Sequence, residues 1–420
     1  MFGSSVGDTH RLWPAAAMTV ALAAALGPGC AAVLTTLGGP APRPAGASAA
    51  PAPGPAAGEA PEVAVWRDVR VIVHCHTWRS HDSDGADDEV IDAARAVGAK
   101  VVLLTDHPSA AAFFERPPPL RRGVLLVPGL EVRCRRGSVL VLGNRGAFPR
   151  GLGPDDLVRE AHARGAVAVL AHAERFEGED PAEVDAVEVH NLHADARDDS
   201  PPGLLLRALV LPPGAFFSSL LDGPAAPALE RFRRLSATRP RAAVAGNDSH
   251  RNIRLFGPLG GAIGTYEETF RVVSTHVLLA PGPVTEEAVL DAIRAARTYV
   301  AFELDADPTG FRFEAQAGDR VHPLGSRLPF RPGEVTLRAE AADPEAEIAL
   351  HADGRGLARG RGRLVAPAPG PGVYHVEVRR DDRLWVLSSP ILLDPSPSPS
   401  PSPAPSPSPP SARAPADAPR

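Results

Sequence analysis

Two histidines separated by one residue close an apolar run in the first patterned region of the chain. His74 and His76 follow the strand-forming residues 69–73, and His81 and Asp82 come next in a short polar turn. Alternate side chains of a β-strand point to one face, so both imidazoles can reach the same metal ion. Imidazole and carboxylate are common ligands of divalent metals, although a His-x-His pair also occurs on ordinary strands. The stretch therefore indicates a metal site that the rest of the chain must complete.

Potential ligands also stand where later apolar runs end. In chain order they are Asp106 and His107, Glu131, His172, His190, and Asp248 with His250. One histidine at a strand end is more often a hydrogen-bonded structural residue than a ligand. Burial of an ionisable side chain is unfavourable unless the group is paired or bound to a metal. The repeated occurrence of such side chains at the ends of apolar runs therefore favours one shared site.

The apolar runs that precede these residues are typical of buried parallel strands. They are residues 69–73, 101–104, 124–128, 138–143, 166–170, 185–189 and 241–246. Helical spacing of apolar residues follows several of them, as at residues 87–98 and 154–165. This repetition predicts an α/β fold, a seven-stranded (β/α)7 TIM-like barrel whose strand ends converge on one face. The long connection at residues 191–240 is expected to add helices over the barrel mouth.

A different pattern follows the expected barrel domain, which covers residues 63–310. Runs such as EVTLRAEA, GVYHVEVRR and RLWVLSSPILL alternate apolar and polar residues and are separated by DGRG and RDDR turns. The pattern predicts a small antiparallel β-sandwich domain over residues 311–393. No ligand cluster is evident in its sequence, so we expect it to pack against the barrel or to act as a spacer.

Five motifs carry a resemblance to a known family. They are VHCHTWRSHDSDG, LLTDH, PGLE, LAHAE and GNDSH, in that order. Their order and approximate spacing over residues 66–300 resemble the PHP (polymerase and histidinol phosphatase) family of metal-dependent phosphoesterases. Within it the chain is similar to an exported or lipoprotein branch of metallohydrolases related to carbaryl hydrolase. The resemblance implies a seven-stranded barrel with two or three divalent metal ions, such as Zn, Mn or Fe.

The resemblance also implies a set of metal ligands. For one metal they are His74, His76, Glu131 and Asp248, with Glu131 bridging to a second metal held by His172. A third site would use His107, His250 and His81.

One position departs from the family pattern. Many relatives carry a histidine at the start of the fourth strand, where this chain has Ser138. A hydroxyl is a poor metal ligand, so the second metal is expected to bind more weakly or to recruit His190 or His193. The alternative is that these two histidines only shape the pocket.

Four further residues are candidates for catalysis or for binding the substrate. Asp82 and Asp106 are carboxylates next to ligand motifs, and Asp106 could either orient His107 or act as a general base. Arg175, like Arg79, lies close in sequence to a ligand motif and could bind a phosphate or another anionic group.

Such a centre predicts a hydrolase. Divalent ions lower the pKa of bound water and neutralise charge that develops on substrate oxygens, which suits phosphate monoesters and diesters best. Two alternatives stay open. One is a metallohydrolase of a carbamate, amide or carboxylic ester, and the other is a catalytically silent binding module of the cell envelope.

The composition narrows the choice of partners. The chain has 44 Lys and Arg against 50 Asp and Glu, a net charge of -6, which leaves no basic field for nucleic acid. Three cysteines allow at most one disulfide, so this is not a disulfide-stabilised scaffold. We expect a small-molecule ester or phosphoester substrate, and the sequence identifies no protein partner.

Both ends of the chain are poor in core-forming residues. An uncharged Ala-rich run after Arg11 predicts an export signal over residues 1–30. The LGPGC stretch ending at Cys30 resembles a lipoprotein cleavage box; a plain cleaved signal peptide and an uncleaved anchor are the alternatives. An Ala/Pro-rich linker at residues 31–62 and a disordered Pro/Ser-rich tail at 394–420 are expected. We therefore expect an exported protein of the cell envelope. It would contact the membrane only through an N-terminal lipid anchor, and without that anchor it would be periplasmic or extracellular.

Overall fold

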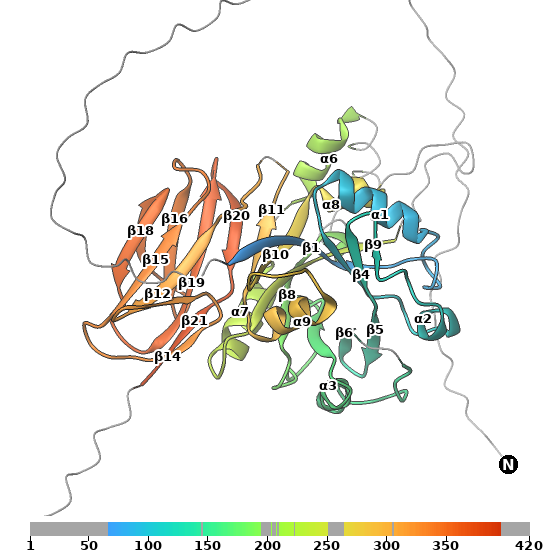
Figure 1. Ribbon diagram of the computed structural model, residues 1–420, viewed down its shortest axis with the longest axis horizontal. Helices are drawn as coiled ribbons and strands as arrows, with labels where there is room; N and C mark the ends of the chain where they lie inside the picture. Colours follow the sequence, from blue (N-terminus) through green and yellow to red (C-terminus); the bar gives the residue numbers. More distant parts are fainter. Residues whose placement is uncertain are drawn as a thin grey trace, which may run out of the picture.

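The protein is described here from a computed structural model (Figure 1). The described residues are 66–143, 146–194, 203, 207, 210–221, 223–250, 264–304 and 306–395. The expected export signal, the linker and almost all of the expected tail lie outside them. Among the described residues, no helix combines the length and the apolar character needed to cross a bilayer.

Parallel strands form the centre of the first half of the structure. In spatial order they are β4 (Val124–Val127), β2 (Val101–Leu104), β1 (Arg67–Cys75), β9 (Ala242–Ser249), β8 (Ala186–Asn191) and β7 (Val167–Ala171). Almost all of their residues are buried, as expected for parallel strands that are covered on both faces. The carboxyl ends of these strands consequently lie along one edge, where the predicted ligands stand.

An antiparallel hairpin interrupts this parallel arrangement. β5 (Gly129–Cys134) pairs with β6 (Gly137–Leu142), and β6 in turn pairs antiparallel with β7. Two residues connect β5 to β6, whereas a parallel crossover needs a dozen or more. The predicted barrel of seven regular β/α units is therefore not seen. The fold is a mixed α/β structure with a large sheet and few helices.

β5 follows β4 almost directly and approaches the end of β2. The backbone N–H of Glu131 donates to the carbonyl of Thr105 at 3.1 Å. Gly129 permits this approach, because a Cβ there would lie 2.6 Å from the carbonyl oxygen of Leu104. This short strand brings Glu131 toward the ends of the parallel strands.

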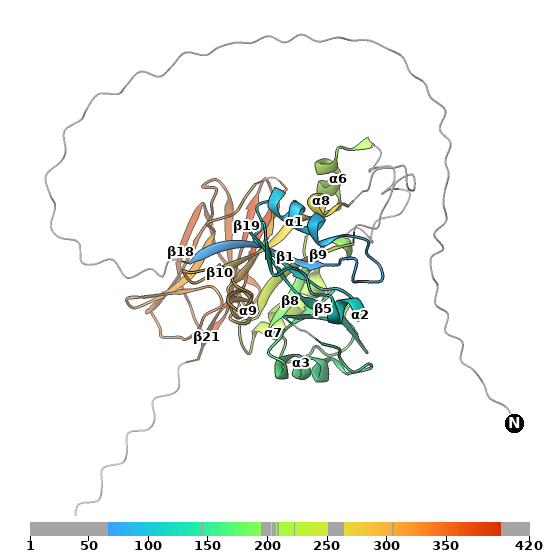
Figure 2. The same cartoon turned by 45° about the vertical axis from the view of Figure 1, so that its right-hand side comes forward.

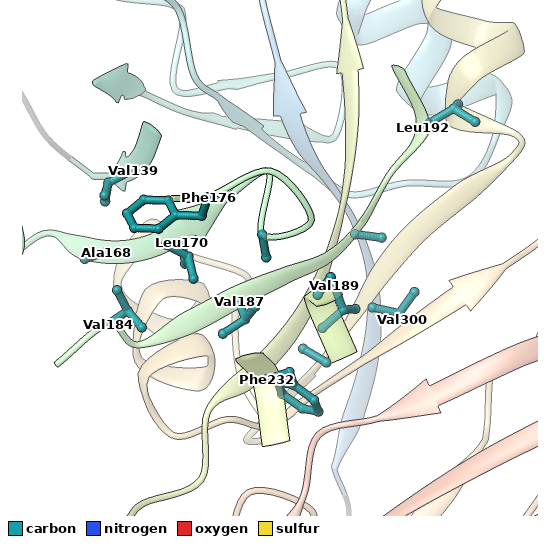
Figure 3. Close-up of a cluster of buried hydrophobic side chains, with 14 of the residues drawn as sticks. Val139, Ala168, Leu170, Phe176, Val184, Val187, Val189, Leu192, Phe232 and Val300 are labelled. Carbon is teal, nitrogen blue, oxygen red and sulfur yellow. The ribbon is translucent and has the colours of Figure 1, made fainter. Parts of the chain in front are cut away.

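Helices pack against the strands of this half. They are α1 (Asp87–Ala96), α2 (Ala110–Phe114), α3 (Pro154–Ala163), α6 (Pro213–Leu220), α7 (Ala226–Ser236), α8 (Tyr266–Phe270) and α9 (Glu286–Arg294). α1 contacts β2 and β4, α3 contacts β6 and β7, and α7 contacts β8. Figure 3 shows Phe232 of α7 among buried side chains that include Val187 and Val189 of β8. α6 and α7 fall in the connection where helices were expected, although most of residues 204–211 lie outside the described residues.

Antiparallel strands link the first half to the second. β1 pairs on its other side with β10 (Val273–Leu279), β10 pairs with β11 (Thr298–Phe302), and β11 pairs with β20 (Arg383–Ser388). The blue β1 of Figure 1 therefore lies near the orange and red strands of the second half. Hydrogen bonds between strands, and not only side-chain packing, join the two halves.

The second half consists of short strands around its own apolar core. They are β12 (Arg312–Ala317), β13 (Arg320–Pro323), β14 (Arg327–Pro329), β15 (Val335–Glu340), β16 (Glu347–Ala352), β17 (Arg355–Arg361), β18 (Arg363–Pro367), β19 (Gly372–Arg380), β20 and β21 (Ile391–Asp394). Apart from the parallel pair β14–β21, their pairings are antiparallel, as the sequence predicts for residues 311–393. Figures 1 and 2 show these strands gathered on one side of the molecule.

Candidate metal centre

Side chains from the strand ends form three overlapping groups of potential metal ligands. The groups are His74, His76, Glu131 and Asp248; His74, His172 and Glu188; and His76, Asp82, His107 and His250. Within each group the ligand atoms lie within 4.8 Å of one another. Because the groups share members, they form one continuous centre at the edge where the parallel strands end.

The first group has the dimensions of a tetrahedral metal site. Nε2 of His74 lies 3.4 Å from Glu131 Oε2 and 3.3 Å from Asp248 Oδ1. Nε2 of His76 lies 3.5 Å and 3.3 Å from the same two oxygens. A zinc ion about 2.0–2.2 Å from four tetrahedral ligands separates them by roughly 3.3–3.6 Å. The Nε2 of His76 is also buried without a hydrogen bond in the described structure. These four residues fit a metal ion.

The backbone bends where it presents these ligands. His74, His172 and Asp248 have left-handed φ angles of 63°, 46° and 50°. The register shifts between Val73 and Cys75 in both pairings of β1. His74 is the extra residue relative to β2, whereas β9 carries the extra residue, between Gly246 and Ser249, relative to β1. Such conformations cost about 1–3 kcal/mol for residues other than glycine and cluster at functional sites. Here they turn three side chains toward one point.

Two carboxylates contact more than one group. Glu131 directs Oε2 toward His74 and His76 and places Oε1 3.5 Å from Nε2 of His172. Asp248 directs Oδ1 toward the same two histidines, and its Oδ2 lies 3.9 Å from Nε2 of His172. Glu131 was expected to bridge two metals, and the structure places Asp248 in a similar position.

In the third group Asp82 replaces the expected ligand His81. Oδ2 of Asp82 lies 3.2 Å from Nε2 of His107 and 3.3 Å from Nε2 of His250. His81 is exposed, and its ring centroid lies 5.0 Å from that of His107. The two residues are neighbours in one turn, so their spacing in the sequence could not show which of them points inward. The ring of His250 also stacks on His76, with centroids 4.2 Å apart.

Glu188 is a functional candidate that the sequence analysis missed. Its Oε1 accepts a hydrogen bond from Nδ1 of His74 at 2.7 Å, and its Oε2 accepts one from the backbone N–H of His172 at 2.6 Å. Gly246 leaves room for it, since a Cβ there would lie 1.7 Å from Oε1. A metal-binding histidine usually donates its other ring N–H to such a carboxylate. The signal was present, because Glu188 is the one acid inside the apolar run 186–189.

The electrostatics of the centre favour positive charge between the carboxylates. Burial alone would raise the pKa of Glu131, but hydrogen bonds with His172 and His74 hold it well below its usual value. Burial would likewise raise the pKa of Asp248, and the charges of His74 and neighbouring histidines hold it well below its usual value. Burial lowers the pKa of His76 to about 4, so this imidazole keeps a free lone pair at neutral pH. Ionised carboxylates beside a neutral imidazole are suited to bind a cation.

A cavity of about 670 Å³ opens onto the centre. Asp82, Glu131, His172, Asp248 and His250 line it, and so do the arginines Arg133, Arg135, Arg136 and Arg175. Within the described ranges, no carboxylate forms an ion pair with Arg133, Arg135 or Arg136. The cavity is thus lined both by candidate metal ligands and by arginines. Of these arginines the sequence analysis had proposed only Arg175, although the RCRR stretch was a visible signal.

Two of the proposed residues lie away from this cavity. Asp106 accepts hydrogen bonds from the backbone N–H of Thr77 at 2.6 Å and from the Thr77 hydroxyl, and burial raises its pKa to about 6. Arg79 forms an ion pair with Asp87 at 2.6 Å. Both residues hold the loop that follows β1. This placement favours a positioning role for Asp106 and for Arg79, and the expectation that Arg79 binds an anionic group stays a prediction.

The structure also shows the surroundings of Ser138 and of the two histidines, His190 and His193, that were expected to compensate for it. Ser138 lines the cavity and pairs across β6 and β7 with Ala171, the neighbour of His172. His193 lines the same cavity, and its ring centroid lies 5.5 Å from that of His250. His190 is buried 5.0 Å from the ring of Phe302 and belongs to none of the ligand groups. Of the two histidines expected to supplement the second metal, only His193 faces the cavity.

Comparison with known proteins gives little further information. No family model and no curated protein matches the chain. Among matching solved structures is a two-domain protein from Bacteroides vulgatus that contains a predicted PHP-like metal-dependent phosphoesterase. It is 14% identical over 79% of this chain and 97% of its own, with a TM-score of 0.39. Similarity at this level does not establish a shared family.

Proposed function

We propose that the protein is a metal-dependent hydrolase that cleaves phosphate monoesters or diesters. The observation that carries this proposal is the cavity whose lining includes both members of the three ligand groups and four arginines. The motif residues of the PHP family coincide with the first ligand group, so we include membership of that family in the proposal. Its carbaryl-hydrolase-like branch has no separate support from the structure.

The proposed reaction divides the work between the bound ions and the chain. Divalent ions held by the three groups would act as Lewis acids toward water and toward a phosphoryl oxygen. Water attacks phosphorus and the ester P–O bond breaks. The OH group of the water becomes part of the phosphate product, and its second proton is transferred to the alcohol that leaves. Glu188 fixes the ring of His74, which would help to hold the first ion.

The charge state of Asp82 limits its role. Burial would raise the pKa of Asp82, but hydrogen bonds with His107 and His250 hold it far below its usual value. Asp82 is therefore ionised at neutral pH. It can bind a cation, but it is a weak base and cannot donate a proton to a leaving group.

The arginines favour an anionic substrate over a neutral one. Guanidinium groups bind phosphate oxygens through short charge-assisted hydrogen bonds. A neutral carbamate, amide or carboxylic ester would enter the same cavity without a charge to match Arg133, Arg135 and Arg136. The alternative hydrolase therefore lacks this support, and a silent binding module would not require the metal dimensions of the first group.

A substrate panel tests the proposal. The purified protein is treated with a chelator, resupplied with Zn, Mn or Fe, and assayed on p-nitrophenyl phosphate, bis-p-nitrophenyl phosphate and p-nitrophenyl acetate. We expect metal to restore hydrolysis of a phosphate ester, and Arg136→Ala to raise KM for it. Arg150→Ala, which changes an exposed arginine outside the cavity, is the control. Metal-dependent hydrolysis of the acetate alone would replace the proposed function with the alternative.

We also propose that the protein is exported and carries a lipid at Cys30. The support is the Ala-rich run after Arg11 and the LGPGC stretch. Fractionation of cells that express the full chain would test this, and unprocessed protein in the cytosolic fraction would contradict it.

A further inference from the structure

A second cluster of potential ligands lies in the C-terminal half, outside the centre described above. β16 and β19 are antiparallel neighbours, and His351 lies directly opposite His375. Glu377 follows His375 by two residues and therefore points to the same face of the sheet. Leu350, which precedes His351, and Val376, which lies between His375 and Glu377, face the apolar core of this half. The three side chains thus gather on the sheet face that points away from that core.

The cluster has the geometry of a ligand set. The ligand atoms of His351, His375 and Glu377 lie within 4.8 Å of one another. The two rings stack with centroids 4.8 Å apart and planes inclined by 14°. Nε2 of His351 lies 3.9 Å from Glu377 Oε1, and it is buried without a hydrogen bond inside the described ranges. His375 is only 4% exposed. A buried imidazole nitrogen without a hydrogen bond, beside a second imidazole and a carboxylate, is an arrangement that can bind a metal ion.

We propose that His351, His375 and Glu377 bind one transition-metal ion, with zinc the best match to two imidazoles and a carboxylate. This site is separate from the hydrolytic centre and does not depend on the proposed function. It also corrects the expectation that the β-rich domain contains no ligand cluster.

The charge state of the cluster suits this binding. Burial lowers the pKa of His375 to about 3, and burial also lowers the pKa of His351. A lowered pKa favours the neutral form of an imidazole, which is the form that binds a metal. The lone pairs are available where a protonated histidine would repel the ion.

Nearby arginines restrict the kind of ion. Arg379 lies 3.5 Å from Glu377 Oε2, and the charges of Arg233 and Arg359 also act on His351. These cations oppose binding of a hard ion that depends on negative charge, such as Mg²⁺ or Ca²⁺. An ion that forms strong bonds to neutral imidazole is less dependent on net charge. The surroundings therefore select for Zn²⁺ or a similar ion.

The position of the cluster suggests a structural role. Arg233 belongs to α7, which packs on β8 of the first half. Its side chain packs closely on Gly354, where a Cβ would lie 2.9 Å from Arg233 Cδ. The metal would therefore bind beside the contact between α7 and the turn after β16. We expect it to stabilise the pairing of β16 with β19 at this contact.

Metal stoichiometry of the full chain tests the proposal. Wild type, His351→Ala and Glu377→Gln are supplied with zinc, desalted and analysed for bound metal. His322→Ala, which changes a histidine of β13 in the same half that belongs to none of the ligand groups of the described residues, is the matched control. We expect both cluster variants to lose one equivalent of zinc while His322→Ala loses none. In zinc titrations, both cluster variants should bind zinc at this site far more weakly than wild type. The loss should exceed the roughly 10- to 100-fold weakening that removal of a supporting residue causes.

A second readout separates this site from the hydrolytic centre. Zinc should raise the melting temperature of wild type more than that of His351→Ala, while phosphate-ester hydrolysis by the two proteins stays equal. Glu377 is partly exposed, so Glu377→Gln keeps the test valid if His351→Ala unfolds. Equal zinc content and equal zinc-dependent melting shifts in wild type, the folded cluster variants and His322→Ala would overturn the proposal. Failure of hydrolysis in all of these proteins would bear on the proposed function alone.

Discussion

At the scale of single residues, the centre depends on carboxylates that orient histidines as much as on the ligands. Glu188 binds the ring of His74 through one oxygen and the backbone at His172 through the other. Burial would raise its pKa, but the charge of His74 and the hydrogen bond with it lower the pKa. The carboxylate therefore stays ionised inside the protein, where it fixes His74 with Nε2 turned toward the other ligands.

Replacing Glu188 by Gln should weaken metal binding without unfolding the protein. The amide keeps the size of the side chain but removes the charge that holds the N–H of His74. Loss of such a supporting group lowers metal affinity by roughly 10- to 100-fold. Metal titration checks this, with Glu183→Gln as a control at an exposed position before the same strand. Unchanged affinity in a folded Glu188→Gln variant would show that His74 does not need this orientation.

A substitution at Ser138 should strengthen metal binding. It lines the cavity next to the strand that ends at His172, where an imidazole could reach the second ion. Ser138→His should tighten the weakest metal-binding step by about an order of magnitude, because imidazole is a far better ligand than a hydroxyl. An unchanged titration curve would mean that His193 or water already fills this place.

The sequence was sufficient to identify most candidate ligands but not their partners. His74, His76, Glu131 and Asp248 follow apolar runs, and that local pattern is visible in the sequence. Whether His81 or Asp82 turns inward depends on the conformation of one loop. The contact between Glu188 and His74 joins residues that are 114 positions apart, which no local pattern can reveal.

At the scale of elements, the parallel strands were predictable and the hairpin was not. The run at residues 101–104 coincides with β2, and the run at 124–128 covers β4. The sequence analysis interpreted PGLE as the end of a strand, whereas Gly129 begins the new strand β5. Its direction follows from the close approach to Leu104 and from the short turn at Arg135 and Arg136. Both are consequences of packing between strands.

A buried charge cluster connects β1, β10 and β11. Nδ1 of His276 lies 2.7 Å from Asp68 Oδ1, and its Nε2 lies 2.9 Å from Glu303 Oε1. Tyr299 donates its hydroxyl proton to Asp68, and Arg70 forms an ion pair with Glu303 at 2.5 Å. Burial would lower the pKa of His276, but the two carboxylates raise it to about 9. The imidazolium therefore stabilises the pairing that joins the two halves of the protein.

This cluster predicts a pH dependence of stability. Because the pKa of His276 is raised in the folded state, its contribution is fully present below about pH 6.5 and is lost as the pH rises through about 9. The difference in free energy of unfolding between wild type and His276→Asn should therefore shrink from pH 6.5 to pH 9, by on the order of 3 kcal/mol. Urea unfolding at both pH values measures it. A difference that grows with pH would contradict the assigned charge.

At the scale of the whole molecule, the two halves share one hydrogen-bonded arrangement of strands. β11 pairs with β10 on one side and with β20 on the other, and its Tyr299 and Ala301 belong to the apolar core of the C-terminal half. The sequence predicted two domains with a boundary near residue 310. It could not show that β10 and β11 would connect them, since that depends on pairings between residues far apart in the chain.

The central claim is that the strand ends hold metal ions that perform hydrolysis. Metal content and phosphate-ester hydrolysis of His351→Ala test it most directly, because this variant removes the proposed C-terminal site from the count. We predict at least two divalent ions per chain in metal-supplemented His351→Ala. The double variant His351→Ala/Asp248→Ala should remain folded but lose metal and hydrolysis. Less than one equivalent of metal, or full activity in the folded double variant, would contradict the account.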